Sequence, residues 1–292
     1  MRPELVQAAE LLRRSDRESV ERAIALLQNT VFSFSMKMCG HREDAEDTMQ
    51  DVLAGSVKHL SKLEQPEALA AWLYTVTRNR CHRMRRKPAG AELPQLSLDE
   101  LMPDEVELQR LLQSHDKTPE KNLLLAEQNK LLQQAVLHVP VPLRLVLVLH
   151  DMEELTSEEV AKILGLQVGT VRVRLHRARL AVRKEMARLE QGISANGKST
   201  ANKPLKRPRS CCAIFASLSE YLDERLEKKH SEQMRAHIED CPACVAFLKD
   251  LRTAIDRCRA LPAECDSALA GRMRKQMTEE YLRTMQVPVG KN

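Results

Sequence analysis

The sequence predicts an all-α protein divided into three helical modules, and three observations support this fold class. The chain has 292 residues, which is enough for two or three modest domains. Only nine Gly and eight aromatic residues are present, which disfavours barrels, sandwiches and Gly-rich nucleotide folds. Apolar residues recur at spacings of three and four along most of the chain, as amphipathic helices require.

The first module, residues 1–87, is predicted to be helical because its apolar residues follow the helical period. The positions that define this period are Leu5, Ala8, Ala9, Leu12, Val20, Ala23, Ile24 and Leu27. Further along, the segment EDAEDTMQD places Asp44, Asp47 and Asp51 on one helix face and apolar residues on another. A solvated acidic face is the ordinary interpretation of such a cluster.

The end of the first module, AWLYTVTRNRCHRMRRK, combines an apolar helix face with a basic tail that contains no acidic residue. This combination is suited to gripping a nucleic-acid backbone. The next stretch, residues 88–122, contains four Pro and a group of Asp and Glu residues. We expect it to be a flexible acidic linker with at most short helices.

The second module, residues 123–190, contains the pattern of a helix-turn-helix. Thr156 or Ser157 with Glu159 offers the capping chemistry that starts a helix, and Gly165 supplies the turn. In the following helix we expect apolar side chains to pack inward and the arginines to cover the remaining surface. The surface set is Arg172, Arg174, Arg177 and Arg179. Such a helix enters the major groove, with Arg side chains divided between phosphates and base edges.

A second linker, basic and flexible, is expected at residues 191–209, before a third helical module at residues 210–292. This module contains the motif HIEDCPAC, in which His237, Cys241 and Cys244 can meet as three soft metal ligands. A closed tetrahedral site needs a fourth ligand. The spacing leaves five candidates for it: Cys211, Cys212, His230, Cys258 and Cys265.

Charge and hydropathy narrow the class of partner and the compartment. The net charge is only +5, but acidic and basic residues are segregated into separate stretches, and two basic stretches suggest a polyanion contacted twice. No apolar run reaches the ~18 residues of a membrane-spanning helix, and the N-terminus lacks the apolar core of a secretory signal. We therefore expect a cytoplasmic protein, whose eight Cys favour metal or redox chemistry over disulfides.

Two segments resemble a known family. REDAEDTMQDV with AWLYTVTRNRCHRMRRK, within residues 31–87, resembles the promoter-melting domain of extracytoplasmic-function (ECF) RNA polymerase sigma factors of the sigma-70 superfamily. VPVPLRLVLVLHDMEELTSEEVAKILGLQVGTVRVRLHRAR, within residues 126–188, resembles the promoter-upstream domain of the same family. The resemblance implies two helical sigma domains joined by a linker, with core RNA polymerase and promoter DNA as partners.

The resemblance also implies roles for individual residues. Four positions match those that dock on the polymerase clamp: Asp44, Asp47, Gln50 and Asp51. Five match the part that captures the minus-ten element and its opened strand: Arg78, Asn79, Arg80, Arg83 and Arg86. Four match the part that reads the minus-thirty-five element: Thr170, Arg172, Arg174 and Arg177.

The third module, CCAIFASLSEYLDERLEKKHSEQMRAHIEDCPACVAFL, resembles the zinc-binding anti-sigma domain. This resemblance implies a Zn²⁺ site in which Cys211 joins His237, Cys241 and Cys244, and it places Glu224 where the family usually has Gly. Because an anti-sigma domain binds its sigma factor, we expect this module to dock on the sigma domains of its own chain. A flexible linker of about 19 residues spans roughly 24 Å and supplies a partner at about millimolar effective concentration.

The sequence therefore predicts a sigma factor, not an enzyme, that is regulated in cis by a zinc-binding domain. The alternative is a helix-turn-helix DNA-binding regulator with a metal- or redox-sensing domain that is not a polymerase subunit; the acidic docking motif argues against it. A zinc hydrolase would need an open metal position and a general base. Glu239 is the one carboxylate suggestively placed for that role, and four available soft ligands favour a closed site.

Overall fold

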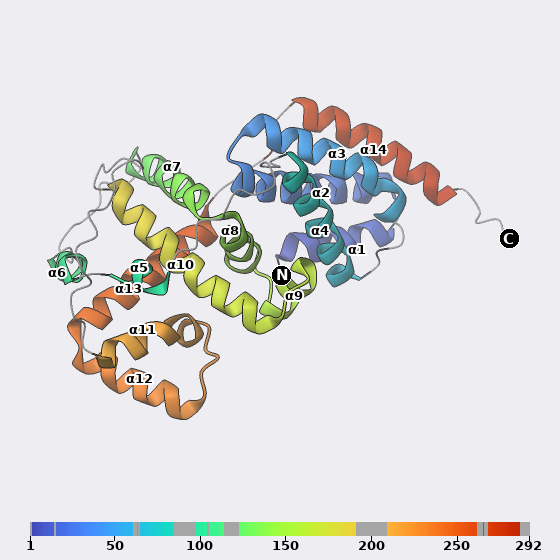
Figure 1. The fold of residues 1–292 in the computed structure, drawn as a ribbon. Coiled ribbons are helices and arrows are strands. Elements are labelled where there is room, and N and C mark those ends of the chain that lie inside the picture. The colour runs from blue at the N-terminus through green and yellow to red at the C-terminus, as the bar shows by residue number, and fades with distance from the viewer. Residues whose placement is uncertain are drawn as a thin grey trace. The chain divides into compact units, whose positions relative to one another are not determined.

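The computed structural model describes most of the chain as helices joined by short turns (Figure 1). The described residues are 2–14, 16–60, 63, 65–84, 97–103, 105–113, 123–190, 209–261, 265 and 268–286. Within these ranges there is no β-strand, so the predicted all-α class is confirmed. Of the two expected linkers, residues 88–96, 104, 114–122 and 191–208 lie outside the described residues.

The chain divides into two compact units. The first unit comprises residues 1–91, 148–168 and 262–292, and the second comprises residues 92–147 and 169–261. Each unit thus combines segments that are far apart in the sequence.

The first unit is built on four helices. They are α1 (Pro3–Arg14), α2 (Arg17–Cys39), α3 (Arg42–Leu60) and α4 (Pro66–Met84). The Asp16 side chain accepts a hydrogen bond from the Ser19 N–H at 2.9 Å and so caps the start of α2. Gly40 ends the same helix in the left-handed conformation, with φ 78°. All eight residues that defined the helical period of α1 and α2 are buried.

Three further elements complete the first unit. They are the π-helical turn η2 (Val148–Met152), α9 (Ser157–Leu164) and the last helix, α14 (Ala268–Gln286). Helix α14 packs along α2 and α3 (Figure 1), burying Met277 and Tyr281. The Tyr281 hydroxyl donates to the Leu12 carbonyl at 3.4 Å, and the Gln28 amide donates to the Ala270 carbonyl at 3.0 Å.

The second unit contains the remaining helices. They are α5 (Leu98–Leu101), α6 (Glu105–Gln113), α7 (Leu123–His138), α8 (Val141–Leu147), α10 (Val168–Glu190), α11 (Arg209–Leu222), α12 (Lys228–Asp240) and α13 (Pro242–Ala260). The acidic segment expected to hold at most short helices forms the short α5 and α6, and α6 packs on α13. Phe215 and Phe247 form an edge-to-face pair, with ring centroids 4.9 Å apart, where α11 meets α13.

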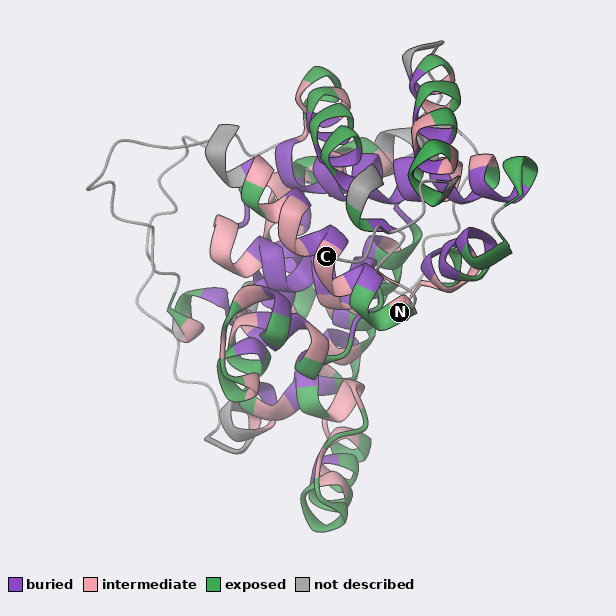
Figure 2. Cartoon of the chain, turned by 90° about the vertical axis from the view of Figure 1, so that its right-hand side faces the viewer, coloured by how far each residue is buried: buried purple, intermediate pink, exposed green. Residues whose placement is uncertain are grey.

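Burial follows the helical period in both units. Figure 2 shows purple buried positions and green exposed positions alternating around the helices, as amphipathic packing requires. Among the described residues, none of the helices combines the length and apolar character needed to cross a bilayer.

Candidate nucleic-acid interface and metal centre

The acidic cluster of the first unit lies on α3. Asp47, Gln50 and Asp51 are exposed, and Asp44 is half-buried. The opposite face packs into the unit through Ala45, Met49 and Val52. This division matches the two faces expected from the sequence. The exposed face carries charge that a basic partner could contact.

Asp51 is paired within the unit, because its carboxylate forms an ion pair with Arg80 of α4. The two residues were assigned to different partners from the sequence, one to polymerase and one to DNA. The structure instead brings them together, so a ligand that engages either side chain must compete with the other. The Arg80 Nε atom is buried and has no hydrogen-bond partner among the described residues.

The basic end of α4 is only partly covered. Arg78 is half-buried, and its guanidinium donates to the Asn79 side-chain oxygen at 2.7 Å and to the Ile163 carbonyl of α9. Asn79 is exposed. Arg83 lies in α4 but its side chain is outside the description, and Arg86 lies outside the described residues.

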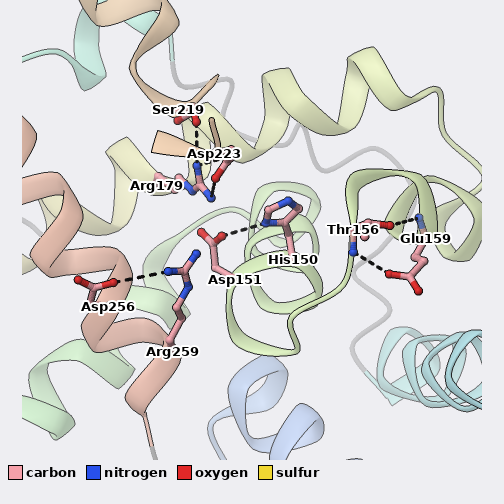
Figure 3. Close-up of polar contacts among 9 residues, drawn as sticks. All are labelled: His150, Asp151, Thr156, Glu159, Arg179, Ser219, Asp223, Asp256 and Arg259. Carbon is pink, nitrogen blue, oxygen red and sulfur yellow. Dashed lines mark hydrogen bonds and ion pairs between the residues drawn. The ribbon is translucent and has the colours of Figure 1, made fainter. Parts of the chain in front are cut away.

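The helix-turn-helix elements form as the sequence predicts. The Thr156 hydroxyl accepts from the Glu159 N–H at 3.2 Å, while the Glu159 carboxylate accepts from the Thr156 N–H at 2.7 Å (Figure 3). This reciprocal capping box starts α9, and Thr156 rather than Ser157 is the cap. Gly165 ends α9 in the left-handed conformation at φ 65°, and α10 begins at Val168.

Helix α10 exposes its first turns and buries its later ones. Thr170 and Arg172 are exposed, and Arg174 and Arg177 are half-buried. All four residues assigned to DNA therefore keep solvent-accessible surface. Val171, Leu175 and Ala178 are buried, as expected.

The expectation that Arg179 covers the surface is wrong. Arg179 is only 1% exposed, because its guanidinium forms two hydrogen bonds with the Asp223 carboxylate at 2.8 and 3.1 Å (Figure 3). Asp223 follows α11 of the C-terminal module. Burial of an arginine is tolerated where a carboxylate matches its planar fork in this way. The face of α10 that carries Arg179 therefore packs against the C-terminal module and not against solvent.

Two more side chains of α10 contact the C-terminal module. The His176 Nδ1 atom lies 2.9 Å from the Ser219 hydroxyl oxygen. The Arg183 guanidinium lies 3.1 Å from the Asp250 carboxylate and 4.6 Å from the centre of the Phe247 ring. Burial, followed by the charges of Arg179 and Arg177, lowers the pKa of His176 from 6.5 to about 4. The imidazole therefore stays neutral in this contact at neutral pH.

Sequence reasoning missed Arg183 as a contact residue. Its guanidinium also pairs with Glu107 of α6, so it joins three helices of the second unit. The sequence signal was available in part, because Arg183 follows Arg179 by four positions and so lies on the same face of α10. The carboxylate partners could not be found from spacing.

Four soft ligands meet in the C-terminal module. One ligand atom from each of Cys211, His237, Cys241 and Cys244 lies within 4.8 Å of the others. The His237 Nε2 atom is 3.3 Å from the Cys244 sulfur and 3.6 Å from the Cys211 sulfur. A tetrahedral zinc ion with its usual bond lengths requires ligand separations of roughly 3.3–3.8 Å. The donor set and its spacing therefore fit Zn²⁺.

Local structure explains how two sulfurs reach one point. Cys241 ends α12 and precedes α13, whose first residue is Pro242, and the Cys244 N–H donates to the Cys241 carbonyl at 3.0 Å. This tight knuckle turns both side chains toward His237 on the last turn of α12. Burial alone raises the pKa of Cys241, but hydrogen bonds from the backbone and thiol of Cys244 outweigh it and lower that pKa. The thiolate form that binds metal is thereby favoured.

The other candidates for the fourth ligand lie elsewhere. His230 is exposed near Glu227, Cys258 is buried on α13, and Cys265 contacts Met49 in the first unit. The side chain of Cys212 is outside the description. Cys211 is thus the candidate that the structure brings to the other three.

Comparison with family models places this geometry among known proteins. Residues 23–90 match the family described as "Sigma-70 region 2", residues 129–182 match "Sigma-70, region 4", and residues 212–244 match "Putative zinc-finger". The chain therefore contains matches to two sigma-70 regions, followed by a match to a zinc-finger domain.

Curated relatives narrow the class. The chain is 26% identical over 172 residues to the RNA polymerase sigma factor YlaC of Bacillus subtilis, covering 59% of this chain and 94% of the relative. It is 26% identical over 178 residues to the ECF RNA polymerase sigma factor SigW of the same organism, covering 60% and 92%. It is 24% identical over 174 residues to the ECF RNA polymerase sigma-E factor of Haemophilus influenzae, covering 58% and 88%. These matches support an ECF-type sigma factor followed by a zinc-binding, anti-sigma-like domain.

Proposed function

We propose that the chain binds core RNA polymerase, directs it to specific promoters and helps to open the duplex, under control of its own zinc-binding domain. The observation that carries this function is the presence of both sigma-70 regions in one chain, in the order region 2 then region 4. A DNA-binding regulator that is not a polymerase subunit has no use for region 2. The first function is therefore favoured over that alternative.

The polymerase-facing surface of this proposal is the acidic face of α3. Asp44, Asp47, Gln50 and Asp51 dock on the polymerase, and their exposure supports this role. Carboxylates on a solvated face gain most from a basic partner when they are held in a row by a helix. Asp47 is the best single probe, because Asp51 also pairs with Arg80.

The DNA-facing surfaces lie on α4 and α10. The minus-ten element is captured by Arg78, Asn79, Arg80, Arg83 and Arg86. Extruding a base from the duplex costs a few kcal/mol, and binding of the opened strand to a cationic surface can offset this cost. Thr170, Arg172, Arg174 and Arg177 read the minus-thirty-five element. Exposure of the first turns of α10 supports this assignment, because the N-terminal part of a recognition helix makes the base contacts.

The zinc site is structural in this proposal. Cys211, His237, Cys241 and Cys244 hold one Zn²⁺ with closed coordination, which leaves no position for a substrate. The metal would join α11 to the junction of α12 and α13, and so hold the C-terminal module in one shape. Loss of the metal would release α11, the helix that precedes Asp223.

Control in cis is supported by the contacts between α10 and the C-terminal module. The module binds the inner face of α10 through Arg179, His176 and Arg183. It leaves Thr170 and Arg172 exposed. The module therefore acts by holding α10 rather than by covering its base-reading turn. A linker that keeps the module at about millimolar effective concentration makes even a weak contact substantially populated.

Co-purification and transcription test the proposal. Asp47→Lys should reduce binding of the full chain to core polymerase at least tenfold, whereas Glu10→Lys, the same charge change at an exposed site on α1, should not. Arg172→Ala should leave polymerase binding intact and weaken transcription from promoters that depend on the upstream element. Unchanged polymerase binding by Asp47→Lys would contradict the assignment of α3.

A further inference from the structure

A buried ion cluster centred on Glu153 joins the two sigma segments of the first unit. Glu153 follows η2, at the start of the helix-turn-helix, and its residue is 0% exposed. Its carboxylate lies 2.8 Å from Lys37 Nζ on α2 and 3.2 Å from Arg2 Nε, and it accepts from the Tyr74 hydroxyl of α4 at 2.7 Å. Lys37 and Tyr74 of region 2, together with Arg2, thus surround a carboxylate that belongs to region 4.

The surroundings of Tyr74 keep its phenol protonated in this cluster. Burial, followed by the negative charge of Glu153, raises the pKa of Tyr74, so the phenol keeps its proton and donates a hydrogen bond to the carboxylate. The Lys37 and Glu153 side chains are 1% and 0% exposed, so water does not separate their charges. The Lys37–Glu153 pair is therefore shielded from solvent, while Arg2, which keeps 21% of its side-chain surface exposed, and the Tyr74 hydroxyl are two further donors to the carboxylate.

A second contact lies at the other end of α9. Helix α9 packs on α4, and the Arg78 guanidinium donates to the Ile163 carbonyl in the last turn of α9. Arg78 is one of the residues that the proposed function assigns to the minus-ten element. Together, the Glu153 cluster and the Arg78 contact hold the first helix of the helix-turn-helix on the DNA-melting helix. We call this arrangement the closed contact.

The closed contact cannot persist while both promoter elements are read. The two promoter elements are centred near positions minus ten and minus thirty-five, about 25 base pairs apart. This separation is about 85 Å along B-form DNA. Helix α10 begins at Val168, directly after the turn that follows Leu164 of α9, and a few residues of extended chain reach roughly 10–15 Å. If α4 binds one element while α9 lies on it, α10 cannot reach the other.

We propose that Glu153 is a latch residue that holds α9 on α4 in the free chain and must be released before the two sigma regions can engage a promoter. The significance of this for promoter reading rests on the proposed function, but the latch itself does not. An ion pair suits a releasable contact, because each charge regains its hydration on separation, whereas an apolar pair would regain nothing. The latch is therefore closed in the free chain and still able to open.

This reasoning predicts that two variants affect the closed contact in opposite directions. Glu153→Gln removes the charge that pairs with Lys37 and leaves the ammonium buried without a counter-ion, so the closed contact should weaken. The triple variant Lys37→Met, Glu153→Leu and Tyr74→Phe replaces the pair and its phenol donor with apolar groups, and Arg2 keeps the Met152 carbonyl as acceptor, so the closed contact should strengthen. Glu154→Gln makes the same chemical change at the adjacent exposed residue and serves as the matched control.

Amide hydrogen exchange on the full chain measures the latch without polymerase or DNA. Amides of α9 should exchange at least tenfold faster in Glu153→Gln than in wild type, at least threefold slower in the triple variant, and within twofold of wild type in Glu154→Gln. Tyr74→Phe removes one donor at little risk to folding and should speed exchange about fivefold. Wild-type exchange of α9 in both Glu153→Gln and Tyr74→Phe would overturn the latch.

A distance measurement separates release of α9 from its local unfolding. Labels carried by non-natural residues at the exposed positions Ala54 on α3 and Lys162 on α9 should show a longer and broader distance in Glu153→Gln than in wild type. An unchanged distance with faster exchange would mean that α9 frays in place, and would also overturn the proposal.

Binding to core polymerase then tests the connection to function. The apparent affinity is proportional to the fraction of chains in the binding-competent state. Glu153→Gln should therefore bind up to tenfold more tightly than wild type, and the triple variant more weakly. If the exchange and distance results hold but no variant binds polymerase, the proposed function fails and the latch stands.

Discussion

The carboxylate of Asp223 accepts hydrogen bonds from both terminal nitrogens of Arg179, a side chain that the sequence alone places on the surface of a DNA-reading helix. Removing the carboxylate leaves a buried guanidinium without its counter-ion, which costs about 3–5 kcal/mol. We expect Asp223→Ala to release the C-terminal module from α10 and to speed amide exchange in α11. Glu220→Ala, at an exposed position on α11, should change exchange less than twofold. Equal behaviour of the two variants would show that the pair does not hold the module.

The contact between α10 and the C-terminal module should weaken in acid because of His176. Its pKa is about 4 in the contact, below the ordinary 6.5, so the contact favours the neutral ring. Its stability is full above pH 6.5, falls by up to about 1.4 kcal/mol per pH unit below that value, and levels off below pH 4, for a total of roughly 3 kcal/mol. The His176 Nε2 atom has no hydrogen-bond partner among the described residues, so a proton there would also lack an acceptor.

The variant His176→Gln isolates this effect. Zinc thiolates also take up protons in acid, but they do so equally in wild type and variant. Exchange in α11, measured from pH 7 to pH 4.5, should therefore rise more steeply with acidity in wild type than in His176→Gln. Parallel pH profiles would assign the acid sensitivity to the metal site alone.

Zinc removal should unfold the C-terminal module. Structural zinc sites contribute folding energy directly, because a preformed site does not exist in the unfolded chain. Cys244→Ser should lose the bound metal and the protection of α12 and α13, whereas Cys258→Ala, which changes a buried cysteine of α13 outside the cluster, should keep one zinc per chain. Elemental analysis of the purified full chain measures this, and zinc retained by Cys244→Ser would contradict the ligand assignment.

The last helix should be held on the first unit by its buried methionines. Met277 is 4% exposed in α14, and truncation of such a residue costs about 2–5 kcal/mol. Met277→Ala should therefore expose the covered faces of α2 and α3 to amide exchange. Met285→Ala changes the same residue type in the same helix at a position that is 45% exposed, and should have little effect.

The residue Glu224, just after the end of α11, has a strained backbone conformation that a substitution can relieve. Glu224 adopts φ 54°, and the bonds from the Arg225 N–H to the Glu220 carbonyl and from the Glu224 N–H to the Tyr221 carbonyl form a Schellman motif, where Gly is preferred. Glu224→Gly should stabilise the module by about 0.5–1 kcal/mol. It relieves the roughly 1–2 kcal/mol that an L residue costs in the left-handed region, and the greater conformational entropy of glycine in the unfolded chain offsets part of this gain. Ala216→Gly, at an exposed position within α11, should destabilise by a similar amount; thermal unfolding of the zinc-bound chain measures both.

Local features of the fold were predictable from the sequence because they depend on neighbours in the chain. The capping box at Thr156, the turn at Gly165 and the buried periods of α1 and α2 all follow from residues within a few positions of one another. The meeting of His237, Cys241 and Cys244 was predictable for the same reason. Composition and period likewise sufficed for the all-α class.

Long-range pairing was not predictable, because charge patterns do not specify which acid meets which base. Arg179 and Arg183 have the sequence context of surface arginines, and their partners Asp223 and Asp250 lie in another module. Lys37 and Glu153 likewise occur in separate sigma segments, with no spacing rule to join them. These are the contacts that relate the modules to one another, and they required the structure.

The packing of α14 on α2 and α3 has a consequence for synthesis. Helix α2 is complete at Cys39, whereas the helix that covers it starts only at Ala268. Ribosomes add about 5–20 residues per second, so the apolar faces of α2 and α3 wait on the order of ten seconds or more for their cover. Throughout that interval the nascent chain exposes an apolar surface that chaperones near the exit tunnel can bind, until residues 268–286 have been synthesised.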